Sequence, residues 1–170
     1  MSLLPVGRSP QVALDGKGDV VAVWGYSTGL QVAMRRSGSD VWQPPVGLSG
    51  VGGWANEPQI AVDGRGDAIA VWTEYKGSDD VLEAAVMPGA SGVWGPVEQL
   101  SSDGSNASYP QVRMDADGEA TVVWCDYDHT TGPSVDFPRF RGHLSAWVER
   151  PGQGGSSAEL EAAVSTGVPS

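Results

Sequence analysis

The sequence predicts an all-β fold, a β-propeller-like array of four-stranded antiparallel blades with three to four units per chain. One segment occurs three times, as PQVALDGKGDVVAVW from Pro10, PQIAVDGRGDAIAVW from Pro58 and PQVRMDADGEATVVW from Pro110. The copies start 48 and then 52 residues apart, a period typical of propeller blades and solenoid units. The composition agrees, because 24 Gly and 12 Pro in 170 residues indicate many turns between short elements.

Each copy predicts a β-hairpin. An alternating strand leads into an Asp- and Gly-rich turn, and a second strand ends at a tryptophan. Gly18, Gly66 and Gly118 recur where a tight turn needs a positive φ, and the aspartate that opens each turn can accept hydrogen bonds from its own backbone. The second strand, 20–24 in the first copy, is apolar on both faces. Such strands are covered on both sides, as they are in a blade between two neighbouring blades.

Two further strands complete each blade. The segments LQVAM at 30–34 and LEAAV at 82–86 predict a third strand. A fourth follows in the Val-Trp and Pro-Val pieces of 41–49 and 93–101. Between the units we expect Gly-, Ser- and Asn-rich crossovers, at 50–57 and 102–109.

We expect residues 1–170 to form a single repeat domain. Its units cover approximately residues 10–57, 58–109, 110–132 and 133–164. The fourth unit is a decayed copy, because Pro133 to Trp147 repeats the proline-to-tryptophan spacing and 160–164 repeats LEAAV. In a second interpretation, 144–148 and 160–164 supply the outer strands of the third unit. In a third, 158–164 is a short helix.

Residues 1–9 form a candidate ring-closing strand, because Pro5-Val6-Gly7 resembles the outermost strand of a unit. One chain terminus commonly completes the blade made by the other, which removes open sheet edges. Three to four units is at or below the smallest rings. We therefore expect a homo-oligomer or a part of a longer repeat array.

The composition limits the classes of partner and cofactor that we expect. A net charge of −11 disfavours nucleic acid and anionic lipid surfaces. We expect no membrane insertion, because no segment approaches eighteen consecutive apolar residues, and the N-terminal residues do not form a signal peptide. The single Cys125 forms no internal disulfide, no Cys/His cluster has metal-ligand spacing, and no cofactor is expected. The acidic balance, low Lys content and seven Trp favour an extracellular bacterial protein.

With MRRSGSDVWQPPVGLS at 34–49, the unit resembles a blade of the sialidase-like superfamily with BNR or Asp-box repeats. Arg36-Ser37 and Asp40 to Trp42 keep the outline of the Asp-box, but the S-x-D-x-G-x-x-W pattern is intact in no unit. The chain is also similar to PQVAVD-type repeat arrays of exported bacterial proteins, for which the resemblance implies no activity.

The resemblance to sialidases implies an arginine triad, a Tyr nucleophile with a Glu partner and an Asp acid/base. None of these can be assigned here, because no motif places three of the arginines in one site. Arg113 stands out, since it replaces Ala13 and Ala61 in the strand expected nearest the axis, where it either binds a carboxylate or is solvated. We predict no catalytic residues and lean against an enzyme.

Other candidate residues are aromatic or acidic. The residues that we expect to contact a ligand, beside Arg113, are Tyr26, Trp54, Tyr75 and Tyr127. Sugar rings stack their C–H faces on such side chains. In contrast, five tryptophans recur in phase and are expected in the core between blades: Trp24, Trp42, Trp72, Trp94 and Trp124. Four carboxylates are candidates for glycoside chemistry: Glu74, Asp126, Asp128 and Asp136.

Calcium has one weak candidate, the Asp115-Ala116-Asp117-Gly118 segment, but the ligands that a calcium loop needs do not follow, so we predict a turn and no metal site. The sequence therefore predicts a non-catalytic binding module for a glycan or a protein. The alternatives are a fragment or remnant of a sialidase-like glycoside hydrolase and a purely structural repeat of a larger surface protein.

Overall fold

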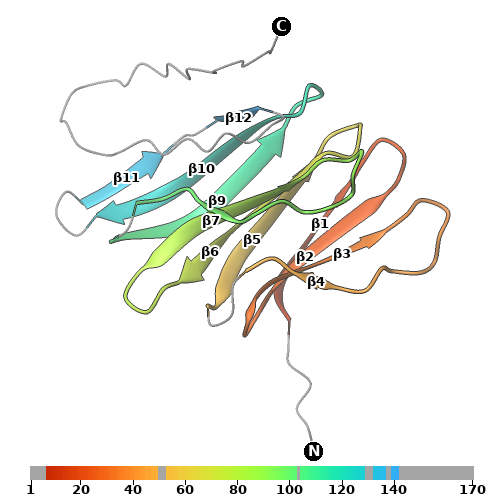
Figure 1. The fold of residues 1–170 in the computed structure, drawn as a ribbon. Coiled ribbons are helices and arrows are strands. Elements are labelled where there is room, and N and C mark those ends of the chain that lie inside the picture. The colour runs from red at the N-terminus through yellow and green to blue at the C-terminus, as the bar shows by residue number, and fades with distance from the viewer. Residues whose placement is uncertain (1–6, 50–52, 103, 129–131, 137–138, 142–170) are drawn as a thin grey trace, which may run out of the picture.

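The computed structural model describes residues 7–49, 53–102, 104–128, 132–136 and 139–141. All regular elements in these ranges are strands, and they form three antiparallel sheets that follow one another along the chain (Figure 1). This confirms the all-β prediction and the propeller-like array of four-stranded sheets. In the described residues the three sheets stand side by side as an open row.

The first two sheets have the same topology, with sequential strands as neighbours. The first contains β1 (Arg8–Leu14), β2 (Val20–Tyr26), β3 (Gly29–Arg35) and β4 (Val46–Gly47). The second contains β5 (Ala55–Val62), β6 (Ala68–Tyr75), β7 (Asp80–Met87) and β8 (Glu98–Gln99). The third contains β9 (Ser105–Met114), β10 (Glu119–Asp128), β11 (Gly132–Asp136) and β12 (Arg139–Arg141). We call these sheets units 1, 2 and 3.

The third unit differs from the expected one. Strand β10 pairs with β9 on one edge and with both β11 and β12 on the other. The pairs Trp124–Asp136 and Thr121–Arg139 belong to one continuous register, so residues 132–136 and 139–141 together occupy the place that β3 and β7 have in the other units. This differs from the expectation that a fourth unit starts at residue 133, because a proline-to-tryptophan spacing does not determine which strand a segment pairs with.

Other expectations for the two ends of the chain fall outside the described residues. These are residues 1–6 of the ring-closing strand, and the proposed strands or helix within 144–164. Residues 8 and 9, which we assigned to that closing strand, belong to β1.

Each first strand starts before the repeated proline and contains a bulge. The residues before the prolines, Ser9, Glu57 and Tyr109, have φ of 48°, 48° and 53°, a conformation that L-residues rarely adopt. The β1–β2, β5–β6 and β9–β10 registers all shift at this point. A bulge bends its strand. Because the bulge recurs at the same position in all three units, the bend belongs to the structure of the repeat. The expected crossovers 50–57 and 102–109 are therefore partly strand.

The predicted Asp-Gly turns are confirmed. Gly18, Gly66 and Gly118 have φ of 87°, 96° and 81°. The aspartates that open the turns are Asp15, Asp63 and Asp115, and each accepts backbone amide hydrogen bonds at 2.8 to 2.9 Å on Oδ1. The same local chemistry therefore closes all three hairpins.

The core lies between the sheets. Strand β6 is buried along its length up to Glu74, as predicted for a strand between two neighbouring blades. One apolar cluster joins units 1 and 2, and a second joins units 2 and 3. Trp72 and Trp124 are buried as expected, whereas Trp24 and Trp94 are half-buried. The prediction for Trp42 is wrong, because its side chain is exposed on the outer part of unit 1.

Candidate functional site: the aromatic end

Exposed aromatic side chains of units 2 and 3 lie toward the end of the sheets where β6 and β10 finish, with Tyr75 and Tyr127 at that end and Tyr109 at the bulge of β9. The group that we call the aromatic end consists of Trp54, Tyr75, Tyr109 and Tyr127, all of them exposed. Three of them were expected to contact a ligand. Tyr109 was missed, and its only sequence signal is its place before a repeated proline, where Ser9 and Glu57 stand in the other units.

Trp54 and Tyr75 form a cross-strand pair. The Tyr75 amide donates a hydrogen bond to the Trp54 carbonyl at 3.2 Å, which continues the register of the Ala55–Glu74 and Asn56–Thr73 pairs before the bulge. Side chains directly opposite each other in an antiparallel pair project from the same face, and these two remain 53% and 47% exposed. The Arg8 guanidinium lies 5.4 Å from the centroid of the Trp54 ring. The Tyr75 hydroxyl donates to the Gly77 carbonyl at 2.6 Å, which fixes its ring.

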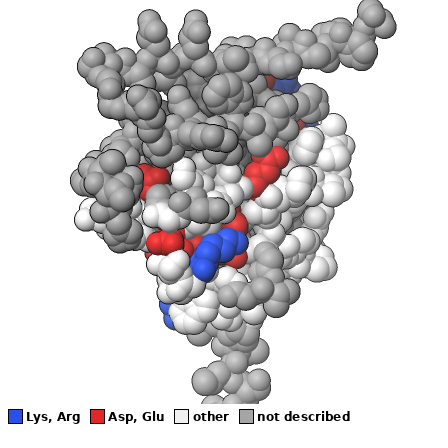
Figure 2. Space-filling view, turned by 60° about the vertical axis from the view of Figure 1, so that its left-hand side comes forward, with Lys and Arg blue, Asp and Glu red and all other residues white. Residues whose placement is uncertain are grey.

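Polar groups next to this pair connect units 2 and 3. The Tyr109 amide donates to Glu57 Oε2 at 2.7 Å, and the Asp80 amide donates to Asn106 Oδ1 at 3.2 Å. Burial raises the pKa of the Asp80 carboxyl, and the charges of Glu57 and Asp79 raise it further. Figure 2, which brings the left-hand side of Figure 1 forward, shows acidic side chains around a basic one. Because Glu57 accepts from the Tyr109 backbone and Asp80 stands opposite Tyr75, carboxylates lie next to two of the tyrosines in the backbone pairing.

A buried carboxylate pair lies behind this surface in unit 2. Lys76 Nζ lies 2.7 Å from Glu83 Oε1 and 3.5 Å from Glu74 Oε1. The indole Nε1 of Trp72 donates to the other oxygen, Oε2, of Glu74 at 3.0 Å. Burial raises the pKa of Glu83, Lys76 opposes this shift, and the Glu74 charge adds to it. Sequence reasoning found Glu74 but missed Glu83 and Lys76, because only the β6–β7 register brings them together.

The same positions in unit 3 lack this pairing. Trp124 and Asp126 replace Trp72 and Glu74, and the shorter aspartate side chain does not reach the indole. Among the described residues, Trp124 Nε1 and Asp126 Oδ1 are buried without a hydrogen-bond partner. In unit 1 the corresponding residue is Tyr26, which is half-buried at the end of β2.

Arg113 lies at the opposite end of its sheet from Tyr127. Its backbone pairs with Thr121 near the hairpin turn, its side chain is exposed, and its Nη1 donates to the Val112 carbonyl at 2.7 Å. The structure therefore brings together Trp54 and Tyr75, places Tyr26 and Tyr127 at the same end of their own sheets, and separates Arg113 from them. Of the other proposed carboxylates, Asp128 and Asp136 are placed by their backbone alone.

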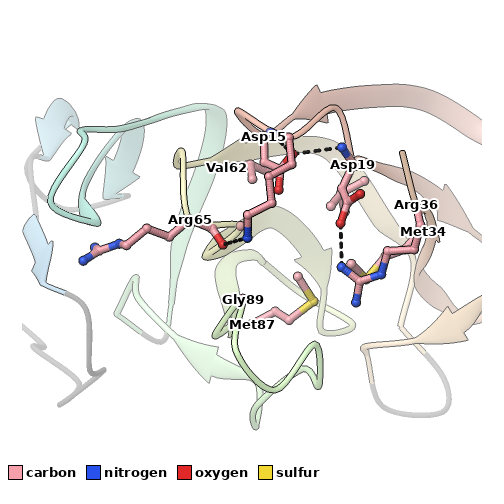
Figure 3. A pocket seen from close by; sticks show the side chains of 11 residues that line it. Asp15, Asp19, Met34, Arg36, Val62, Arg65, Met87 and Gly89 are labelled. Atoms are coloured by element: carbon pink, nitrogen blue, oxygen red, sulfur yellow. Dashed lines mark hydrogen bonds and ion pairs between the residues drawn. The ribbon is translucent and has the colours of Figure 1, made fainter. Parts of the chain in front are cut away.

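A cleft lies between the turns of units 1 and 2 (Figure 3). Arg36 Nη1 and Asp19 Oδ2 are paired at 2.6 Å on one side of it, while the Arg65 side chain runs away from it. Lys17 Nζ donates to the Arg65 carbonyl at 3.2 Å. The cavity volume is about 20 Å³, enough for about one water molecule, so the cleft does not admit a sugar ring.

The turn residues also join successive units in one direction. Lys17 reaches the carbonyl of Arg65, and Arg65 Nη2 reaches the carbonyl of Asp117 at 2.5 Å. These three residues occupy the same position in their turns, so each basic side chain binds its counterpart in the next unit.

Within the described part of the chain, no group of three or more His, Cys, Asp or Glu side chains is arranged to hold a metal ion. A search of the same residues finds no helix that could span a membrane.

These features define an all-β repeat protein with propeller-like sheets and exposed aromatic rings at one end. No protein-family model and no curated protein matches the chain. Among solved structures, it is similar to the endo-arabinase from Bacteroides thetaiotaomicron VPI-5482, with a TM-score of 0.44 and 17% identity over 82% of this chain and 57% of the arabinase chain. The chain thus spans little more than half of that structure, and the resemblance to sialidase-like repeats rests on sequence motifs alone.

Proposed function

We propose that this chain is a non-catalytic binding module that binds a glycan at the aromatic end. The observation that carries the proposal is the exposed Trp54–Tyr75 pair, held on one face of a sheet by backbone pairing. The apolar C–H faces of sugar rings pack on aromatic side chains, which combine a large apolar surface with a polar tip. The carboxylates of Glu57 and Asp80, on the backbone next to this pair, are the proposed acceptors for hydrogen bonds from the hydroxyl groups of the sugar. Composition supports an extracellular location for such a module.

The buried carboxylates support a binding role more than a catalytic one. Glu74 has both oxygens engaged, one by Trp72 and one by Lys76, and Lys76 also pairs with Glu83. A nucleophile or general acid must reach its substrate, and these groups reach each other instead. The pair therefore stabilises the sheet behind the aromatic surface.

The alternative, a remnant of a glycoside hydrolase, is favoured by one observation. Lys76 Nζ bridges Glu74 Oε1 and Glu83 Oε1 at 3.5 and 2.7 Å, so the two carboxylates are neighbours, and burial raises the pKa of Glu83, as in a general acid. Release of nitrophenol from a panel of aryl glycosides, abolished by Glu83→Gln, would support this alternative and oppose the binding module.

The test of the proposal is a glycan array followed by titration of the best soluble glycan. Trp54→Ala should weaken binding by at least tenfold, and Tyr75→Ala by a similar factor. Trp42→Ala is the matched control, because Trp42 is also exposed but lies in the outer part of unit 1. Equal glycan affinity of Trp54→Ala and the wild type would overturn the glycan proposal. So would a chain that binds no glycan on the array but does bind a protein ligand.

A further inference from the structure

Unit 1 leaves open a sheet face that units 2 and 3 bury. The β1–β2 register sets Val12 opposite Ala22 and Leu14 opposite Val20, so these side chains share one face with Trp24. We call this set the leading face of unit 1. Val12 and Leu14, on β1, are 58% and 61% exposed, whereas Ala22 and Trp24 are half-buried and Val20 is buried. Single exposed apolar residues are ordinary on protein surfaces, but a contiguous apolar sheet face indicates an interaction site.

The same face is covered in the two units that follow. In unit 2 it consists of Ile60, Val62, Ala68, Ala70 and Trp72, which pack on unit 1 residues Val21, Val23, Leu30, Val32 and Met34. In unit 3 it consists of Val112, Met114, Ala120, Val122 and Trp124, which pack on unit 2 residues Ile69, Val71, Leu82 and Ala84. Val112, the counterpart of Val12, is 1% exposed. The difference between units thus comes from the presence of a preceding sheet.

Trp42 gives independent support. Its counterpart Trp94 packs against the cluster between units 1 and 2. Trp42 itself is exposed, with the Arg35 guanidinium 5.8 Å from its ring centroid. An indole that belongs to a junction in unit 2 is therefore left at the surface in unit 1.

Among the described residues, unit 3 leaves open the complementary face. Thr121, Val123 and Cys125 alternate along β10, and the β9–β10 register adds Gln111 and Arg113 to the same face. All of these except the half-buried Val123 are exposed. The counterparts of the three β10 residues in unit 2, Ile69, Val71 and Thr73, are all buried. We call this set the trailing face of unit 3. On β9 and β10 this face is more polar than on the corresponding strands of units 1 and 2, so a junction on these two strands is weaker than the junctions within the chain.

We propose that the leading face of unit 1 docks on the trailing face of unit 3 of a second copy of this chain. Each junction within the chain joins a leading face to the trailing face of the preceding unit, and the junction between copies continues the same packing. The three sheets of the described residues are fewer than the four to eight blades of known rings, whereas two copies supply six such sheets. A head-to-tail contact of this kind closes into a ring when the rotations add up.

The experiment is the solution mass of the full chain by light scattering across a concentration series. The wild type should have about twice the chain mass of 17.7 kDa. Val12→Glu with Leu14→Glu on the leading face, and Thr121→Glu on the trailing face, should each give a single chain. Val93→Glu is the matched control, since Val93 is equally exposed in the loop before β8 and lies on neither face.

A mixture of the two face variants distinguishes head-to-tail packing from other modes. One junction of the ring remains intact in the mixture, so its mass should rise above that of either variant alone. A monomeric wild type would overturn the proposal. It would indicate that the leading face packs against other residues of this chain or against a different partner. A dimer that Thr121→Glu leaves unchanged, or a mass that grows with concentration beyond two chains, would also overturn it. Circular dichroism verifies that each variant is folded.

Discussion

Replacement of Lys76 by Met tests the buried carboxylate pair. Lys76 forms ion pairs with both Glu74 and Glu83, whose side chains are 2% and 8% exposed, while its own side chain is 45% exposed. Removal of one partner from a fully buried pair costs about 3–5 kcal/mol, and an exposed pair contributes about 0–1 kcal/mol. Because solvent screens the lysine, we expect an intermediate loss of about 1–2 kcal/mol at neutral pH.

The loss should depend on pH with a defined sign. Lys76 lowers the pKa of Glu83 against the effect of burial, so Lys76→Met should raise that pKa further above its unfolded value of 4.5. A folded-state pKa above the unfolded one makes stability fall as pH rises between the two values. The deficit of the variant should therefore be smallest below pH 4.5 and largest at neutral pH.

Thermal unfolding followed by circular dichroism measures the effect. A loss of 1–2 kcal/mol corresponds to a fall in Tm of about 2–8 °C for a chain of this size. Lys17→Met is the control, because Lys17 is exposed and donates only to a backbone carbonyl. If both variants lose the same stability, or if the Lys76→Met deficit is constant with pH, the account of this pair is refuted.

Two further predictions concern backbone geometry. Asp63→Ala should lower the free energy of unfolding by about 1–3 kcal/mol, because Asp63 accepts three amide hydrogen bonds where Asp15 accepts two. Burial raises the pKa of Asp63, but the Arg65 side chain and these amides outweigh burial and hold it below 3.8. The stability that ionised Asp63 contributes is therefore lost as pH falls below that value. Asp15→Ala should cost less in urea unfolding, and an equal cost would contradict the ranking. Gly25→Ala should cost about 1–3 kcal/mol, because its Cβ would meet the Ala55 carbonyl oxygen. Gly64→Ala meets open space and should leave the unfolding midpoint unchanged; equal effects of the two would show that the close approach is relieved at no cost.

The repeat and its turns could be predicted because they depend on local sequence. The Asp-to-Gly turn needs one aspartate and one positive φ within four residues, and these recur at Gly18, Gly66 and Gly118. The two-faced strand is also a local pattern, and its burial in β6 follows from it. Trp54 and Tyr75 could be named as exposed because they fall outside the repeated core positions.

The remainder depends on which segments pair. Glu83 and Lys76 join Glu74 only through the β6–β7 register, which no short motif encodes. Residues 132–136 match the proline spacing of a first strand but pair as a third strand. Trp42 has the sequence position of Trp94, and its exposure reflects a missing neighbour that the repeat pattern does not reveal.

The most direct test of the central claim, that the aromatic end binds a glycan, is the indole NMR spectrum of the chain during glycan titration. Each of the seven tryptophans contributes one Nε1–H resonance. The account predicts that the Trp54 resonance, assigned by its loss in Trp54→Phe, shifts with saturable dependence on glycan. The Trp72 resonance, buried and hydrogen-bonded to Glu74, should stay in place. A spectrum in which Trp54 is unmoved while Trp42 or no resonance shifts would contradict the claim.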